Sequence, residues 1–195
     1  MTGIFLNAAI FSITLLMVVC VFFRGDHGWD GKRGRSAMRF FTAQSNVFCA
    51  VTALLLCLFP QSPIVWRLKY IGTAAVTVTM LTVFLFLAPS VGKGWASVLL
   101  RGSDIFMHLI TPLLALISFC FLEKRGMDFG TALLGMLPVL IYGPWYLYKI
   151  RFAPEGKRWE DFYGFNKGGR WPVSFVMMAL GTFLICMGLM AMQNR

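Results

Sequence analysis

Charged residues are scarce in this sequence. Only 13% of its 195 residues are Asp, Glu, Lys or Arg, whereas 58% are hydrophobic and the mean hydropathy is +0.72. Because about a quarter of the residues of a soluble globular domain are charged, this composition excludes an ordinary soluble domain. The charges gather in short clusters between long apolar runs, which is typical of a polytopic helical membrane protein. We expect residues 1–195 to form a single transmembrane domain.

Cysteine motifs and internal repeats are also missing. The five cysteines fall in apolar runs, with no C-x-x-C pair and no pair of loop cysteines. We therefore expect no disulfide framework and no zinc site, and we expect no cofactor. The absence of a convincing internal repeat does not favour a transporter built from two repeated halves.

The first apolar run, at residues 4–23, lacks the features of a cleaved signal peptide. No basic residue precedes it, no small-residue cleavage site follows it, and it is too long. We expect it to be a retained membrane span.

Six apolar runs approach the roughly 20 residues that a membrane-spanning helix needs. The predicted fold class is all-α, a bundle of six transmembrane helices at residues 4–23, 41–59, 68–88, 103–122, 130–150 and 172–192. We expect Pro60 and Pro63 to close the second span and Pro89 to close the third. Pro112 lies inside the fourth span and predicts a kink.

Most of the 18 Lys and Arg residues lie in or beside the odd-numbered loops. The residues concerned are Arg24, Lys32, Arg33, Arg35, Arg39, Lys93, Arg101, Lys149, Arg151, Lys157, Arg158, Lys167 and Arg170. Because basic loops stay in the cytoplasm, we expect a multi-pass cell-membrane protein with cytoplasmic odd-numbered loops and both termini outside. The net charge of +10 then reflects orientation and contact with anionic membrane lipids, and we expect no nucleic-acid partner. The aromatic loop at residues 159–172 is expected to cap a site on the cytoplasmic face.

Polar side chains open the second span. Thr42, Gln44, Ser45 and Asn46 stand in its first two turns, and Cys49 follows. All but Gln44 are spaced three and four residues apart, so they share one helix face. Polar side chains in hydrocarbon face the bundle interior or a wet cavity. A purely structural role stays open, because Ser and Thr often bond the carbonyl one turn back and Asn often joins helices.

The fourth span carries a second polar stripe. Its members are Asp104, His108, Thr111, Ala115 and Ser118. His108 is the only histidine in a predicted span, since His27 lies in a loop, and an ionisable residue in a span indicates function. Asp104 is four residues away, so its carboxylate can reach the imidazole and fix the tautomer. The alternative is that Asp104 pairs with Arg101 at the interface.

These two stripes share a depth in the membrane. His108 lies seven residues past Arg101, or about 10 Å along a helix. Both spans descend from the cytoplasmic side, so Thr42 and His108 are expected to approach one another in the same leaflet. A metal site at Asp104 and His108 is not expected, because a third strong ligand is missing nearby.

The stretches RFFTAQSN, at the start of span two, and DIFMHLITPLLAL, in span four, resemble a known superfamily of multispan membrane proteins. It is the superfamily of the androgen-induced gene product and the androgen-dependent TFPI-regulating protein, with bacterial relatives. The relatives have a similar aromatic–Phe–Thr–x–Gln–Ser–Asn start and a His followed four residues later by Pro, here His108 and Pro112. The six-span layout is also similar.

This resemblance implies an intramembrane hydrolase of fatty acid esters of hydroxy fatty acids. By this resemblance, Thr42 would be the nucleophile and His108 would be the catalytic histidine. Gln44 and Ser45 follow the bacterial pattern, because the animal proteins have a different run after the threonine. More distant relatives resemble acyltransferases that use a cysteine nucleophile.

The residues then suggest a mechanism. His108 would remove the Thr42 proton, Asp104 would orient the imidazole, and Asn46 or Gln44 would donate a hydrogen bond to the oxyanion. The expected substrate is a lipid or fatty acid ester whose acyl chain stays in the bilayer. The alternatives are a non-enzymatic membrane transport or lipid-binding protein and an acyltransferase on the same scaffold.

Overall fold

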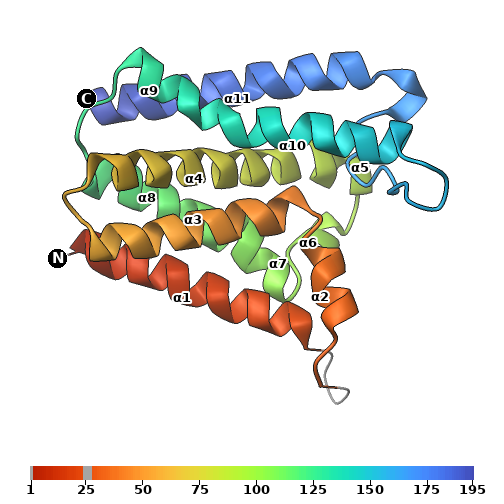
Figure 1. Ribbon diagram of the computed structural model, residues 1–195, viewed down its shortest axis with the longest axis horizontal. Helices are drawn as coiled ribbons and strands as arrows, with labels where there is room; N and C mark the ends of the chain where they lie inside the picture. The colour runs from red at the N-terminus through yellow and green to blue at the C-terminus, as the bar shows by residue number, and fades with distance from the viewer. Residues whose placement is uncertain (1, 24–27) are drawn as a thin grey trace.

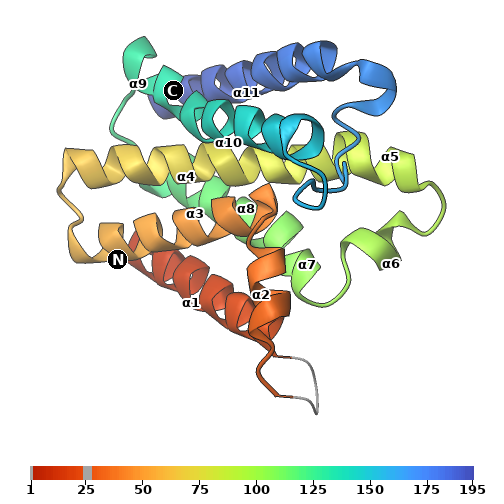
Figure 2. The same ribbon diagram turned by 45° about the vertical axis from the view of Figure 1, so that its right-hand side comes forward.

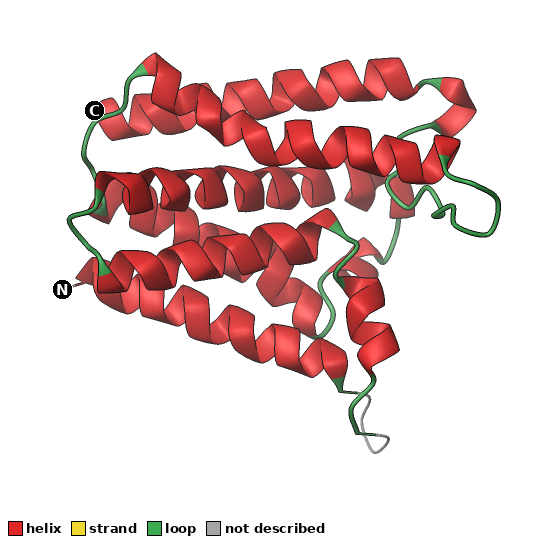
Figure 3. Cartoon of the chain, viewed as in Figure 1, coloured by secondary structure: helices red, strands yellow, loops and turns green. Residues whose placement is uncertain are grey.

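The computed structural model describes residues 2–23 and 28–195, and it is an all-α bundle (Figures 1 and 3). Six helices are long and apolar enough to cross a membrane, which confirms the predicted fold class. They are Thr2–Phe22, Phe41–Leu58, Pro63–Val91, Ser103–Leu122, Phe129–Phe152 and Trp171–Asn194. Two residues of the first loop considered above, Arg24 and His27, lie outside the described residues.

The third span is longer than the sequence predicted, and two of the expected proline boundaries were wrong. Pro63 begins helix α4 (Pro63–Thr82), and the Ser62 side chain caps it by accepting the Val65 N–H at 3.3 Å. Proline is tolerated there because the first turn of a helix needs no donor from it. At the other end, Pro89 lies within α5 (Ala88–Val91), which continues the same span.

Several spans depart from α geometry along their length. The fourth begins with α7 (Ser103–Ile105), widens into a π-helical turn at Phe106–Ile110, and resumes as α8 (Thr111–Ile117) and a second π turn at Ser118–Leu122. The first of these π turns contains His108. Pro112, which follows it, lacks the N–H that would bond the His108 carbonyl, so a regular α ladder is interrupted there.

Four spans enclose a common interior. Helix α1 (Thr2–Phe22) packs against α3 (Phe41–Leu58) and α8, and α3 and α8 both pack against α4 (Figure 1). The fifth span, α9 (Phe129–Leu133) and α10 (Leu137–Leu147), and the sixth, α11 (Trp171–Asn194), pack together and onto α4. The bundle therefore has a four-helix part, formed by spans one to four, and a two-helix part, formed by spans five and six, which packs onto α4.

The loops alternate between the two ends of the bundle. Loops one, three and five lie at one end, here called the odd-loop end, while α1 starts and α11 finishes at the even-loop end (Figure 1). Two short helices in these loops were not predicted: α2 (Gly31–Ala37), capped by Asp30, and α6 (Trp95–Leu99). Figure 2 shows α5, α6 and α7 following one another at the odd-loop end.

The bundle is apolar outside and partly polar inside. Large hydrophobic side chains such as Phe5, Ile141 and Leu184 are exposed, whereas Asn46, Lys69 and many threonines are buried. Lipid can solvate an apolar exterior, but buried polar groups must find partners inside the protein. This distribution is typical of a membrane-embedded bundle.

Candidate functional site

A cavity of about 310 Å³ lies at the odd-loop end of the bundle. Thr42 from α3, Asp104 from α7 and His108 from the first π turn all line it. The other lining residues are Val21, Ala37, Met38, Phe40, Ala43, Leu87, Met107, Phe162 and Tyr163. The cavity thus combines three of the predicted site residues with a mostly apolar wall.

Thr42 stands in the first turn of α3. The helix starts after Phe40, whose backbone is extended and whose side chain supplies no cap. The Phe41 N–H instead donates to the Tyr163 hydroxyl at 3.0 Å. Because the first N–H groups of a helix lack partners within it and carry the positive end of its dipole, this end of α3 favours negative charge beside Thr42.

His108 reaches the same cavity from the fourth span. Its neighbour Met107 is buried, whereas His108 itself is half-buried at the cavity wall. The π turn changes which side chains share a face, so it aims His108 differently from a regular helix. Such turns occur frequently at functional sites.

Asp104 lies at the start of span four and is half-buried. It lines the cavity with His108, and the two side chains interact electrostatically. Arg101, the alternative partner, is exposed, and its carbonyl accepts the Asp104 backbone N–H at 3.2 Å. The geometry therefore brings Asp104 towards His108.

Asn46 links the two polar stripes without lining the cavity. Its side-chain amide donates to the Thr42 carbonyl at 2.8 Å and to the Met107 carbonyl at 3.0 Å. Both hydrogens of the amide are thereby used, and the side chain is fully buried. Asn46 consequently ties the backbone of Thr42 to that of His108's neighbour and has no hydrogen left for an oxyanion.

Gln44 and Ser45 do not line the cavity. Gln44 is exposed, and its amide donates to the Met38 carbonyl at 3.0 Å. Ser45 is buried between α3 and α4, where its hydroxyl bonds the Thr42 carbonyl at 3.1 Å and the Thr79 hydroxyl at 2.9 Å. The cavity therefore gathers Thr42, Asp104 and His108 but not the other three predicted residues.

Loop five covers the cavity with aromatic side chains. Asp161 organises this loop: its carboxylate accepts the Tyr146 hydroxyl at 2.9 Å and the N–H groups of Phe165 and Asn166 at 2.9 and 2.7 Å. Phe162 packs against Phe40 with the two rings tilted and their centroids 4.4 Å apart. The loop thus places Phe162 and Tyr163 beside the first turn of α3.

Tyr163 is the polar residue of this cavity that was not predicted. Burial raises the pKa of its phenol, while the hydrogen bond from the Phe41 amide offsets part of that rise. The hydroxyl therefore stays protonated at neutral pH. The aromatic character of the loop indicated a cap, but no sequence spacing relates Tyr163 to a residue more than 100 positions earlier.

Cys49 does not line the cavity. It is fully buried in an apolar layer with Ile10, Val76 and Ala115. Within the described residues, no three His, Cys, Asp or Glu side chains are grouped so as to hold a metal ion. The reactive groups at the cavity are a hydroxyl, an imidazole, a carboxylate and a phenol.

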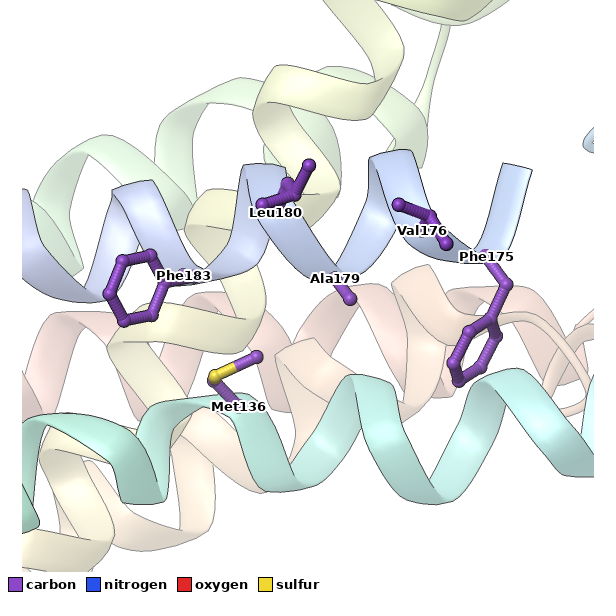
Figure 4. A pocket seen from close by; sticks show the side chains of 6 residues that line it. All are labelled: Met136, Phe175, Val176, Ala179, Leu180 and Phe183. Atoms are coloured by element: carbon purple, nitrogen blue, oxygen red, sulfur yellow. The ribbon is translucent and has the colours of Figure 1, made fainter. Parts of the chain in front are cut away.

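A second hollow, between α11 and the fifth span, has no such chemistry (Figure 4). It is lined only by Met136, Phe175, Val176, Ala179, Leu180 and Phe183. These apolar side chains lie on the outer part of the bundle, where they are suited to contact with lipid tails.

Comparison with protein-family models, with curated proteins and with solved structures finds no match for this chain. Its class rests on the fold: a bundle of six apolar helices consistent with a polytopic, multi-pass membrane protein.

Proposed function

We propose that the protein is an intramembrane hydrolase of lipid or fatty acid esters, with Thr42 as nucleophile and His108 as general base. The observation that carries the proposal is that Thr42, His108 and Asp104 line one cavity. The motif resemblance to the superfamily of the androgen-induced gene product and the androgen-dependent TFPI-regulating protein supports it independently.

In the first half-reaction, the Thr42 oxygen attacks the ester carbonyl while His108 takes the hydroxyl proton. The tetrahedral intermediate collapses, the bond to the alcohol oxygen breaks, and His108 returns the proton to that oxygen. Water then attacks the acyl-threonine ester, with His108 accepting its proton and delivering it to Thr42. The net products are a carboxylic acid and an alcohol.

Asp104 is a positioning residue in this scheme. Its electrostatic interaction with His108 favours the imidazolium that forms during attack. Asn46 holds the two backbones together through the Thr42 and Met107 carbonyls.

Oxyanion stabilisation falls to Tyr163 and to the start of α3, rather than to Gln44 or Asn46. The Tyr163 hydroxyl lies at the first turn of α3, where it accepts the Phe41 N–H and keeps its own proton to donate. A hydroxyl donor at a helix N-terminus suits a developing negative charge.

The cavity wall supports an acyl substrate. Val21, Leu87 and Met107 offer apolar contact to a chain, and Arg39 lies over the Phe40 and Phe162 rings at the same end. A guanidinium at this level would meet an acidic lipid head group.

Two other functions use the same cavity. Its largely apolar lining also suits a lipid-binding or transport protein that performs no chemistry. Acyl transfer would use the same acyl-threonine, with an alcohol in place of water. Cys49 is disfavoured as a nucleophile because it is fully buried outside the cavity.

The test is ester turnover by the purified full-length protein. We expect hydrolysis of p-nitrophenyl acyl esters and covalent labelling by a fluorophosphonate, both lost in Thr42→Ala and partly retained in Thr42→Ser. Thr52→Ala, at a threonine further along α3 and outside the cavity, is the matched control. Saturable lipid binding with no turnover in folded protein would replace the hydrolase by the binding function.

A further inference from the structure

Lys69 is fully buried, although it is the second residue of the third span predicted from the sequence, at residues 68–88, next to the second loop. It lies in α4, its side chain is 0% exposed, and its ammonium nitrogen has no hydrogen-bond partner among the described residues. A bare ammonium in a low-dielectric interior would cost several kcal/mol. Its surroundings must therefore supply a counter-charge and acceptors.

A candidate for the counter-charge is Glu123, which follows span four. The Trp66 indole, one turn before Lys69 in α4, donates to the Glu123 carbonyl at 2.8 Å. The charges of Lys69 and Glu123 both act on the thiols of Cys49 and Cys57, so both charged groups lie near α3.

The Glu123 carboxylate is itself only half satisfied. One oxygen accepts hydrogen bonds from the Asn7 side-chain amide and the Ser118 hydroxyl. The other oxygen is buried and without a partner among the described residues, as is the side-chain oxygen of Asn7, a residue that is 2% exposed. One cationic donor, the Lys69 ammonium, and two acceptors, the Glu123 and Asn7 side-chain oxygens, therefore lack hydrogen-bond partners among the described residues. All three lie in the same part of the interior.

This polar group is separate from the cavity of Thr42. An apolar layer of Ile10, Cys49, Ala53, Val76 and Ala115 lies inside the four-helix part. Asn7 and Ser118 lie one turn from Ile10 and Ala115 towards the even-loop end, whereas Thr42 and His108 lie towards the odd-loop end.

We propose that Lys69 and Glu123 form an ionised pair bridged by internal water, making a buried hydration site at the even-loop end. Water fits because it can accept from the ammonium and donate to the Glu123 and Asn7 oxygens. An anion would meet two acceptor oxygens, and a metal cation would meet the ammonium, so neither complements the open groups. The site joins spans one, three and four through charge and hydrogen bonds.

The pairing is tested by a charge-removal cycle on the full-length protein in detergent. Lys69→Met and Glu123→Gln should each lower Tm by about 5–15 °C, because each leaves one buried charge uncompensated. The double variant should recover at least half of that loss. Arg67→Met, at an exposed position of the same helix, is the matched control.

Additive losses of Tm in the double variant, or single variants with unchanged Tm, would overturn the proposed pairing of Lys69 with Glu123. If neither single variant folds, a folded double variant still supports it and an unfolded one counts against it.

The hydration is tested by water-edited ¹⁵N solid-state NMR of lysine-labelled protein in bilayers. The signal that Lys69→Arg removes should have the shift of a charged ammonium and receive magnetisation quickly from water. A neutral amine, or a charged ammonium without water contact, would overturn the water-bridged pair. Neither experiment depends on ester hydrolysis.

Discussion

Tyr163 shows how a hydroxyl from a distant loop completes the candidate site. It lies 121 positions after Thr42 in the chain and still bonds the N–H of the adjacent Phe41. Because burial raises the pKa of the Tyr163 phenol, the group remains a donor at neutral pH. Its hydroxyl can thus be tested apart from its ring, which packs against Tyr146 and Phe162.

Tyr163→Phe removes that hydroxyl and leaves the ring. If Tyr163 donates to the oxyanion, kcat should fall by about 10²–10³-fold with little change in KM, because the lost bond forms in the transition state. Steady-state ester hydrolysis measures both constants. Tyr148→Phe, at an exposed tyrosine of span five, is the control. A kcat within a factor of about two of wild type would assign Tyr163 to packing only.

Asp104→Asn separates the two roles proposed for this carboxylate. An orienting role predicts a fall in kcat of about 10²-fold in folded protein, because the amide no longer favours the imidazolium. A surface pair with Arg101 predicts at most about 1 kcal/mol of lost stability and little change in kcat. Arg101→Gln, measured in the same ester assay, should leave kcat unchanged. Near-native turnover in Asp104→Asn would show that Asp104 has a structural role and that Thr42 and His108 act as a dyad without it.

At the scale of elements, α3 packs closely against α4 at Gly72. A Cβ built there would lie 2.9 Å from the Cys49 Cα and 2.9 Å from the Thr52 hydroxyl oxygen. Contact with backbone at that distance cannot be relieved by a side-chain rotation. The register of α3 against α4, and with it the position of Thr42, depends on this glycine.

Gly72→Ala should therefore destabilise the bundle by about 1–3 kcal/mol, as overpacking does. Thermal unfolding in detergent, followed by tryptophan fluorescence, measures the change. Gly181→Ala is the matched control, because that helical glycine has no atom near the added methyl group. Its stability should stay the same or rise slightly, since alanine is the better helix former. Equal effects of the two substitutions would contradict close packing at Gly72.

The π turn at Phe106–Ile110 illustrates how a local irregularity serves a site. Pro112 removes a donor from the ladder, and the helix responds with a wider turn that contains His108. Asn46 then bonds the freed region through the Met107 carbonyl. A polar residue in α3 thus stabilises an irregular segment of span four.

At the scale of the whole molecule, the candidate site and most of the basic residues share the odd-loop end. The positive-inside rule places that end in the cytoplasm, and hence both termini outside. This orientation is a prediction about the membrane, and it would put the ester site in the cytoplasmic leaflet.

A reporter fused after Arg195 checks the orientation in cells. We expect alkaline phosphatase to be active there and a cytoplasm-dependent fluorescent protein to be dark. Fusions truncated at Lys157, in loop five, should give the reverse pattern and serve as the control. Fluorescence at the C-terminus with no phosphatase activity would invert the topology and move the cavity to the outer leaflet.

The sequence by itself determined the number, type and approximate bounds of the membrane helices. Membrane thickness and the need to bond every backbone group leave few alternatives for six apolar runs. Helical periodicity also identified the stripes of Thr42 and His108, because residues three and four apart share a face. It did not separate Thr42 from Ser45, which shares its helix face and whose place depends on how far α3 is rotated against its neighbours.

Only the tertiary structure decided the residues that depend on contacts between distant segments. Tyr163 reaches α3 because Asp161 folds loop five, and Asn46 lost its expected oxyanion role because its amide meets the Met107 carbonyl. The sequence put Lys69 at the start of the third predicted span, at residues 68–88, and took Pro63 as the end of the second span. The helix instead begins at Pro63, so Lys69 lies in its second turn and is fully buried in the bundle. Local sequence does not show this burial, because it depends on how the other spans pack around α4.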